Sequence, residues 1–96
     1  MLLVFDPQTG HLVLGVVAGP KRKRKSILRH RKLIGEAIRQ YRKRARYTQE
    51  ELAEWADLNP KYLGEIERGE KIISIEALLR VSKALKVPIR DFFRGV

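Results

Sequence analysis

The chain has 96 residues and a mass of 11.2 kDa, which is enough for one small domain. It contains no cysteine and only two histidines, so a disulfide framework and a zinc site of thiolates or imidazoles are excluded. Its 21 Lys and Arg outnumber 11 Asp and Glu, and the excess lies in residues 21–48, with 13 basic residues and one acid. Charge concentrated in this way predicts a polyanionic partner.

The apolar residues are arranged differently from those of a membrane protein. No apolar run approaches the ~20 residues that cross a bilayer. The apolar start of the chain precedes the basic block and is interrupted by Asp6, whereas a signal peptide carries its positive charges first. We therefore expect no membrane partner.

Residues 1–20 predict a β-hairpin. Two apolar segments, residues 1–5 and 11–17, flank the turn residues 6–10, in which Pro7 presets the backbone. Most positions in both segments are apolar, so both faces of the hairpin need cover. The sequence leaves three interpretations: the hairpin packs on the rest of the domain, it dimerises the protein by strand pairing, or the segment is disordered.

Residues 21–32 predict a basic arm or an extension of the first helix. Gly19 and Pro20 break the chain, and a block of like charges follows that usually stays extended until a polyanion arrives. A DNA-binding arm, a solvated linker and a nuclear localisation signal are the alternatives. The block consists of Lys21, Arg22, Lys23, Arg24 and Lys25.

Residues 33–94 have the apolar spacing of helices and predict an all-α orthogonal bundle of five helices. The first helix runs from about residue 32 to residue 44. Its buried stripe comprises Ile34, Ile38, Tyr41 and Ala45. Thr48 and Glu51 predict a capping box at the start of the second helix. The buried stripe of this helix comprises Leu52, Ala53 and Ala56.

The third helix is expected at about residues 60–67. Asn59 suits its N-cap, Pro60 its first position and Gly69 the turn after its end, while Leu63 and Ile66 face inward. Ser74 begins a fourth helix, whose stripe comprises Ile75, Leu78, Leu79, Ser82 and Leu85. Pro88 opens a fifth, with Ile89, Phe92 and Phe93 facing inward.

The connection between the second and third helices is a three-residue turn, residues 57–59. Such a turn sets two helices roughly at right angles. Asp57 can adopt the left-handed conformation that the turn needs, and Leu58 fills the angle between the helices.

Four segments form a wider pattern. They are Thr48-Gln49-Glu50-Glu51-Leu52-Ala53, Asn59 with Tyr62-Leu63, Ile66-Glu67-Arg68-Gly69, and Ile75-Glu76-Ala77-Leu78-Leu79 with Leu85-Lys86-Val87-Pro88. Together they resemble the Cro and phage-repressor type of helix-turn-helix, the XRE family, over about residues 33–93. The resemblance implies a lambda-repressor-like five-helix fold, preceded here by the β-hairpin and basic arm, that binds double-stranded DNA.

The resemblance also implies roles for individual residues. Gln49 matches a glutamine that sits on a DNA phosphate, and Arg42 and Glu67 match a structural salt bridge that orients the arginine towards a phosphate. The third helix enters the major groove, where its exposed face reads base edges. That face comprises Asn59, Lys61, Gly64 and Glu65. Glu65 has a second interpretation, as a salt-bridged surface residue paired with Lys61.

Further side chains flank the motif and are expected at the DNA backbone, with simple solvation as the alternative. The expected phosphate contacts are Arg42, Arg44, Arg46, Tyr47, Thr48, Gln49, Tyr62, Arg68 and Lys71. Trp55 lies one step off the buried stripe of the second helix, and it either covers the core edge or receives the hairpin or a second subunit.

Two classes of function follow. The first is a sequence-specific transcriptional regulator that acts as a homodimer on an inverted repeat. The second is an antitoxin that binds operator DNA and, through the hairpin or arm, a toxin protein. RNA binding is disfavoured because A-form RNA hides its major groove. The sequence has no catalytic motif, so we expect no enzyme activity, cofactor, metal or small-molecule ligand. We expect the protein at the nucleoid, in the cytoplasm of a bacterial, archaeal or phage-infected cell.

Overall fold

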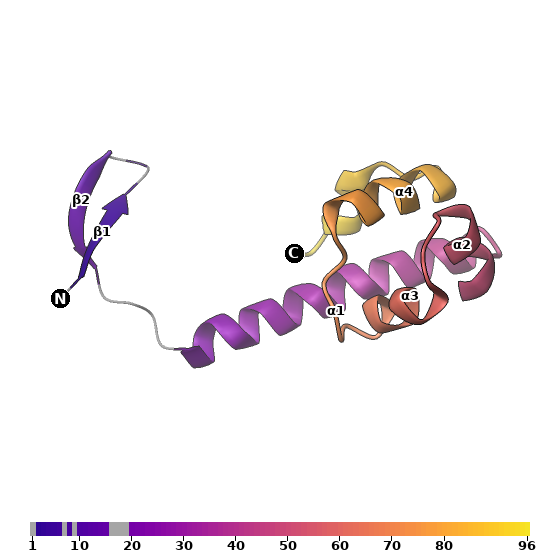
Figure 1. The fold of residues 1–96 in the computed structure, drawn as a ribbon, viewed down its shortest axis with the longest axis horizontal. Coiled ribbons are helices and arrows are strands. Elements are labelled where there is room, and N and C mark those ends of the chain that lie inside the picture. The colour runs from indigo at the N-terminus through magenta and orange to yellow at the C-terminus, as the bar shows by residue number, and fades with distance from the viewer. Residues whose placement is uncertain (1, 7, 9, 16–19) are drawn as a thin grey trace.

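A computed structural model describes residues 2–6, 8, 10–15 and 20–96. Two strands, β1 (Leu2–Asp6) and β2 (His11–Gly15), precede four helices, α1 (Pro20–Arg44), α2 (Gln49–Trp55), α3 (Pro60–Glu67) and α4 (Ile75–Leu85) (Figure 1). The last element, η1 (Ile89–Phe93), is a 3-10 helix where a fifth helix was predicted. No helix within the described ranges is long and apolar enough to cross a membrane.

The strands β1 and β2 pair antiparallel, with Leu2 opposite Gly15 and Asp6 opposite His11. The prediction placed the second strand at residues 11–17, and its last two positions lie outside the described residues, as does Pro7 of the turn.

The helices enclose one hydrophobic core, and α1 is its longest wall. The helix α1 packs against α3 and η1, while α2 packs against α3 and α4 (Figure 1). Phe92 of η1 is fully buried and meets the ring of Tyr41 edge to face, with the ring centroids 5.5 Å apart. The buried core comprises Ile34, Ile38, Leu52, Ala53, Ala56, Leu63, Ile66, Ile73, Ala77, Leu78, Val81, Leu85 and Phe92.

The helix α1 begins at Pro20, so residues 21–32 extend the first helix, which is one of the two predicted alternatives, and the basic block is not an extended arm. Proline suits the first position of a helix, and lysine and arginine are good helix formers. Extending a helix that the core already stabilises adds one hydrogen bond for each residue that becomes ordered. Figure 1 shows the first half of α1 running beyond the other helices. At the other end α1 stops at Arg44, and Ala45, predicted to be buried, is exposed.

The helices α1 and α3 approach closely at Gly35. A Cβ at this position would lie 2.1 Å from the carbonyl oxygen of Ile66, closer than any real contact. Gly35 is therefore required by the packing of α3 on α1. The pattern of apolar residues did not reveal this role, because it depends on a carbonyl 31 residues further along the chain.

The buried face of α4 is rotated from the predicted one. Leu78 and Leu85 are buried as expected, but Ala77 and Val81 complete the face. Ile75 is 73% exposed, Leu79 is also exposed, and Ser82 is half-buried. The prediction chose the largest apolar side chains, whereas the packing of α4 against α2 and η1 decides which face turns inward. In η1, Ile89 and Phe92 face the core as expected, but Phe93 is exposed.

The predicted starts of α2, α3 and α4 are confirmed. The side-chain oxygens of Thr48, Asn59 and Ser74 each accept a backbone N–H in the first turn of α2, α3 and α4. The turn between α2 and α3 also has the expected conformation, with Asp57 left-handed at φ 53° and Leu58 packed on the core. Gly69 follows α3 at φ 76°, a conformation that favours glycine.

Candidate nucleic-acid interface

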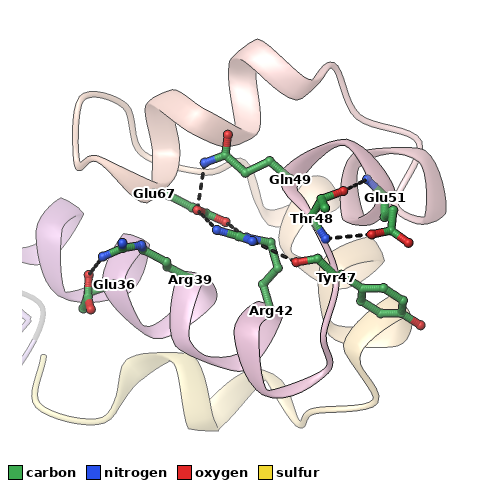
Figure 2. Close-up of polar contacts among 8 residues, drawn as sticks. All are labelled: Glu36, Arg39, Arg42, Tyr47, Thr48, Gln49, Glu51 and Glu67. Carbon is green, nitrogen blue, oxygen red and sulfur yellow. Dashed lines mark hydrogen bonds and ion pairs between the residues drawn. The ribbon is translucent and has the colours of Figure 1, made fainter.

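A buried ion pair joins α1 to the end of α3. Arg42 donates from Nε to Glu67 Oε2 at 2.7 Å and from Nη2 to Glu67 Oε1 at 2.9 Å (Figure 2). The side chains are only 11% and 2% exposed. The hydrogen bond to Glu67 raises the pKa of Arg42, so the buried guanidinium stays charged. The salt bridge that the resemblance implies is therefore present, and two parallel hydrogen bonds form it.

The same carboxylate holds Gln49, the first residue of α2. Gln49 Nε2 donates to Glu67 Oε1 at 2.9 Å, and Arg42 Nη1 donates to the carbonyl oxygen of Tyr47 at 2.8 Å (Figure 2). One network therefore orients the start of α2, the end of α3 and the second half of α1. Because an amide nitrogen carries two protons, Gln49 keeps one N–H for a ligand. No local sequence pattern predicts this contact, since the two residues are 18 positions apart.

The start of α2 is fixed independently by the capping box. The Glu51 backbone N–H donates to Thr48 Oγ1 at 3.1 Å, and the Thr48 backbone N–H donates to Glu51 Oε1 at 3.0 Å (Figure 2). Hydrogen bonds to the Glu51 carboxylate from the Thr48 backbone N–H, and secondarily from the Thr48 side chain, lower the pKa of Glu51. Thr48 is exposed, and its hydroxyl oxygen accepts the Glu51 backbone N–H in the cap.

The exposed face of α3 differs from the predicted one at Gly64. Lys61 and Asn59 are exposed, and Asn59 Oδ1 caps the helix by accepting the Lys61 backbone N–H at 2.8 Å. Gly64, in contrast, is buried. A Cβ there would lie 3.0 Å from Arg68 Nη1 and 3.4 Å from Gln49 Oε1. These two long side chains fold over the small residue, so its backbone is not open to DNA as predicted.

Glu65 is paired, but with a different lysine from the predicted one. Its carboxylate lies 3.5 Å from Nζ of Lys71, in the loop after α3. Lys61 precedes Glu65 by four residues, and this order of charges is the less favourable one on a helix. The turn at Gly69 brings Lys71 back towards Glu65 instead.

The remaining predicted contacts lie around this surface. Tyr62 is half-buried on the core, and its hydroxyl oxygen accepts the Ser74 backbone N–H at 3.1 Å. Tyr47 also packs on the core, Arg46 is exposed, and Arg44 lies 5.3 Å above the ring of Tyr41. Arg68 is exposed and pairs with Glu70, which raises the pKa of Arg68.

Two predicted features lie away from this network. Trp55, at the end of α2, is 71% exposed, so it does not cover the core edge. The basic block forms part of α1, but its side chains are outside the described part of the structure.

The comparisons with known proteins match the helical part of the chain. A family model described as a helix-turn-helix, HTH_3, matches residues 38–92, more than half of the chain. The control protein C.BamHI of Bacillus amyloliquefaciens is 39% identical over 62 residues, covering 64% of this chain and 76% of the relative.

Two solved structures show the same fold. The restriction-modification controller protein C.AhdI of Aeromonas hydrophila has a TM-score of 0.64 at 30% identity, covering 66% of this chain and 96% of its own. The biofilm master regulator SinR, solved in complex with DNA, has a TM-score of 0.60 at 42% identity, covering 62% and 95%. The chain therefore belongs to the HTH_3 family of XRE-type helix-turn-helix proteins, and it is a DNA-binding transcription regulator and not an enzyme.

Proposed function

We propose that the protein binds an inverted-repeat operator as a homodimer and that each copy inserts α3 into the major groove. The network of Arg42, Glu67 and Gln49 is the observation that carries this proposal. It fixes the start of α2 beside α3 and leaves a Gln49 N–H free for a phosphate. The similarity to C.AhdI and to SinR bound to DNA supports the same conclusion.

In this proposal Lys61 is the main base reader. It is exposed on α3 and can donate to the N7 and O6 acceptors of guanine. The Asn59 amide nitrogen is a further donor beside it, since only Oδ1 is used by the cap. Glu65 can accept a hydrogen bond from a cytosine amino group only if its ion pair with Lys71 breaks. Gly64 contributes by letting Gln49 and Arg68 close over it.

The phosphate contacts supply affinity without reading sequence. We assign this role to the exposed or half-exposed donors around α2 and α3 and to the basic first half of α1. Arg42 acts differently, because its guanidinium is committed to Glu67 and Tyr47. The proposed phosphate ligands are Arg44, Arg46, Tyr47, Thr48, Gln49, Tyr62, Arg68 and Lys71.

We propose a separate role for each of the three segments that differ in charge. Residues 33–94 form the DNA-binding unit, residues 21–32 extend α1 with positive charge, and residues 1–20 form the dimerisation element. A homodimer with two-fold symmetry places two copies of α3 about 34 Å apart, one turn of B-form DNA. Since the relatives are bacterial proteins, we propose that this regulator works at the nucleoid.

Selection of bound sequences from random DNA tests the proposal. We expect a symmetric site with two half-sites centred about one helical turn apart. Enrichment of no sequence, or of a single unrepeated half-site, would contradict it. Sedimentation of the chain with and without residues 1–19 tests the dimer. An unchanged oligomer after the deletion would show that the hairpin does not form the interface.

A further inference from the structure

An open cleft of about 770 Å³ lies beside the Arg42 and Glu67 network. One wall is the middle of α1, and the opposite wall is the start of α2 and the end of α3. Its lining comprises Lys32, Leu33, Glu36, Arg39, Gln49, Glu67 and Arg68. Arg39 is not among the phosphate ligands assigned above, and Lys32, at the end of the basic first half of α1, brings a second cation to the same space.

The polar residues of α1 point to this cleft from one side of the helix. Lys32, Glu36 and Arg39 are spaced by four and three residues, which places them on one helix face. Next to the cleft, the turn after α3 packs closely on Lys32. A Cβ on Gly69 would lie 2.7 Å from Lys32 Cγ and 3.1 Å from Lys32 Cα. The turn after α3 therefore rests against α1, so the two walls are held at a fixed separation.

The charges in the cleft favour an anion. Lys32 and Arg39 contribute two positive charges, Arg68 contributes a third that it shares with Glu70 in an exposed ion pair, and Gln49 contributes an amide donor. Glu67 is already neutralised by Arg42 and is only 2% exposed. Glu36 is the remaining carboxylate of the lining; it is half-exposed and lies 3.8 Å from Arg39 Nη1 (Figure 2). That long ion pair is easily exchanged, because exposed pairs contribute little free energy.

We propose that this cleft binds one phosphate of the DNA backbone between α1 and the α2–α3 pair. Lys32 and Arg39 are its ligands from α1, and Gln49 and Arg68 close it from the opposite wall. Arg39 leaves Glu36 when the phosphate enters, since a phosphate offers a guanidinium two-point hydrogen bonding with a larger charge. The inference rests on the proposed function, because it assumes that α3 lies in the major groove beside this phosphate.

The first test compares two double variants of the full-length chain on the selected operator. Lys32→Gln with Arg39→Gln removes the α1 ligands. Lys83→Gln with Arg90→Gln removes two exposed cations from α4 and η1, outside the cleft. We expect the cleft variant to lower the log–log salt slope of binding by about 0.9, the value for one phosphate, and the control to leave it unchanged. An unchanged slope in the cleft variant would overturn the proposal.

A second test uses the wild-type protein and single neutral methylphosphonates in the operator. We expect one phosphate in each half-site whose neutralisation weakens wild-type binding more than it weakens the binding of the cleft variant, which keeps Gln49 and Arg68, as a double-mutant cycle requires for a direct contact. Equal weakening of both proteins at every position would overturn the proposal. Whether the wild-type protein binds the operator tests the proposed function separately. Failure of the proposed function is therefore distinguishable from failure of the cleft proposal.

Glu36→Gln supplies a gain of function. It removes the carboxylate that competes for Arg39, so we expect DNA binding to tighten by about two- to fivefold, the scale of an exposed ion pair. Glu76→Gln is the matched control, because Glu76 also pairs with an arginine on an exposed helix face, here Arg80 of α4. Equal tightening by both variants would mean that only net charge matters, and the assignment of Arg39 would be wrong.

Discussion

Gln49 and Glu67 share a 2.9 Å hydrogen bond, and the Glu67 oxygen that accepts it also accepts a guanidinium proton from Arg42. The first residue of α2 is therefore held by the last residue of α3 and, through it, by α1. This relationship makes the orientation of Gln49 a property of the fold. Gln49 therefore contributes to the stability of the fold and, in the proposed function, to DNA binding. Substitutions at Gln49 and Glu67 can separate these two contributions.

Loss of the Glu67 charge should destabilise the fold. In Glu67→Gln the buried Arg42 has no counter-ion, so we expect the free energy of unfolding to fall by about 3 kcal/mol. Urea denaturation measures this. Glu70→Gln is the control, because Glu70 pairs with Arg68 at an exposed site and should change stability by less than about 1 kcal/mol. Similar losses in the two variants would show that burial of the Arg42 pair has no energetic consequence.

Gln49→Ala should weaken DNA binding more than it weakens the fold. The lost hydrogen bond to Glu67 accounts for about 1 kcal/mol of stability. Loss of the phosphate contact should reduce affinity equally for operator and non-operator DNA and leave the salt slope unchanged, because a neutral amide displaces no counterion. Gln40→Ala removes an exposed glutamine of α1 that bonds Glu36 and should leave binding unchanged. A loss confined to the operator would instead identify Gln49 as a base contact.

Lys61→Ala should relax sequence preference at one base pair. A lysine that bonds guanine contributes roughly 1–3 kcal/mol to discrimination at its position. Binding to a panel of single-base operator variants measures this. Arg44→Ala, by contrast, should weaken binding to every member of the panel alike. If Lys61→Ala also gave a uniform loss, Lys61 would be a phosphate contact.

Gly35→Ala should destabilise the protein, although alanine is the better helix former. Helix propensity alone predicts a gain of about 1 kcal/mol. The added Cβ would meet the backbone of Ile66 at 2.1 Å and push α3 off α1, so we expect a net loss of about 1–3 kcal/mol. Gly64→Ala is the matched control. Its Cβ would meet only the flexible ends of Arg68 and Gln49, so we expect no comparable loss of stability. A gain in stability at Gly35 would contradict the close approach of the two helices.

The capping box should make stability depend on acid pH. Hydrogen bonds from Thr48 lower the pKa of Glu51 in the folded protein. The contribution of Glu51 is therefore present above the ordinary pKa of glutamate and is lost as the pH falls through the lowered value. Thermal unfolding of the wild type and Glu51→Gln across this range measures it. The two proteins should converge at low pH, and a constant difference at all pH values would exclude the ionised cap.

Helix starts and the α2–α3 turn were predictable because their determinants are local. The caps at Thr48, Asn59 and Ser74 are hydrogen bonds that span two or three residues. The left-handed Asp57 likewise belongs to a three-residue turn. The start of α1 stayed open between an arm and an extension of the helix for the opposite reason. Mutual repulsion of the basic block favours an extended chain, while the stability of a helix anchored by a distant core favours its continuation.

The amino-acid pattern alone was sufficient to establish the family resemblance, the charge segregation and the residues that face the core of α2 and α3. Packing between distant segments decided the rest. It buried Gly64 beneath Gln49 and Arg68, paired Glu65 with Lys71, turned Ile75 to solvent and placed Lys32 and Arg39 opposite Gln49. Periodicity records which residues share a helix face. The direction in which that face points depends on the neighbouring helices, which are far away in sequence.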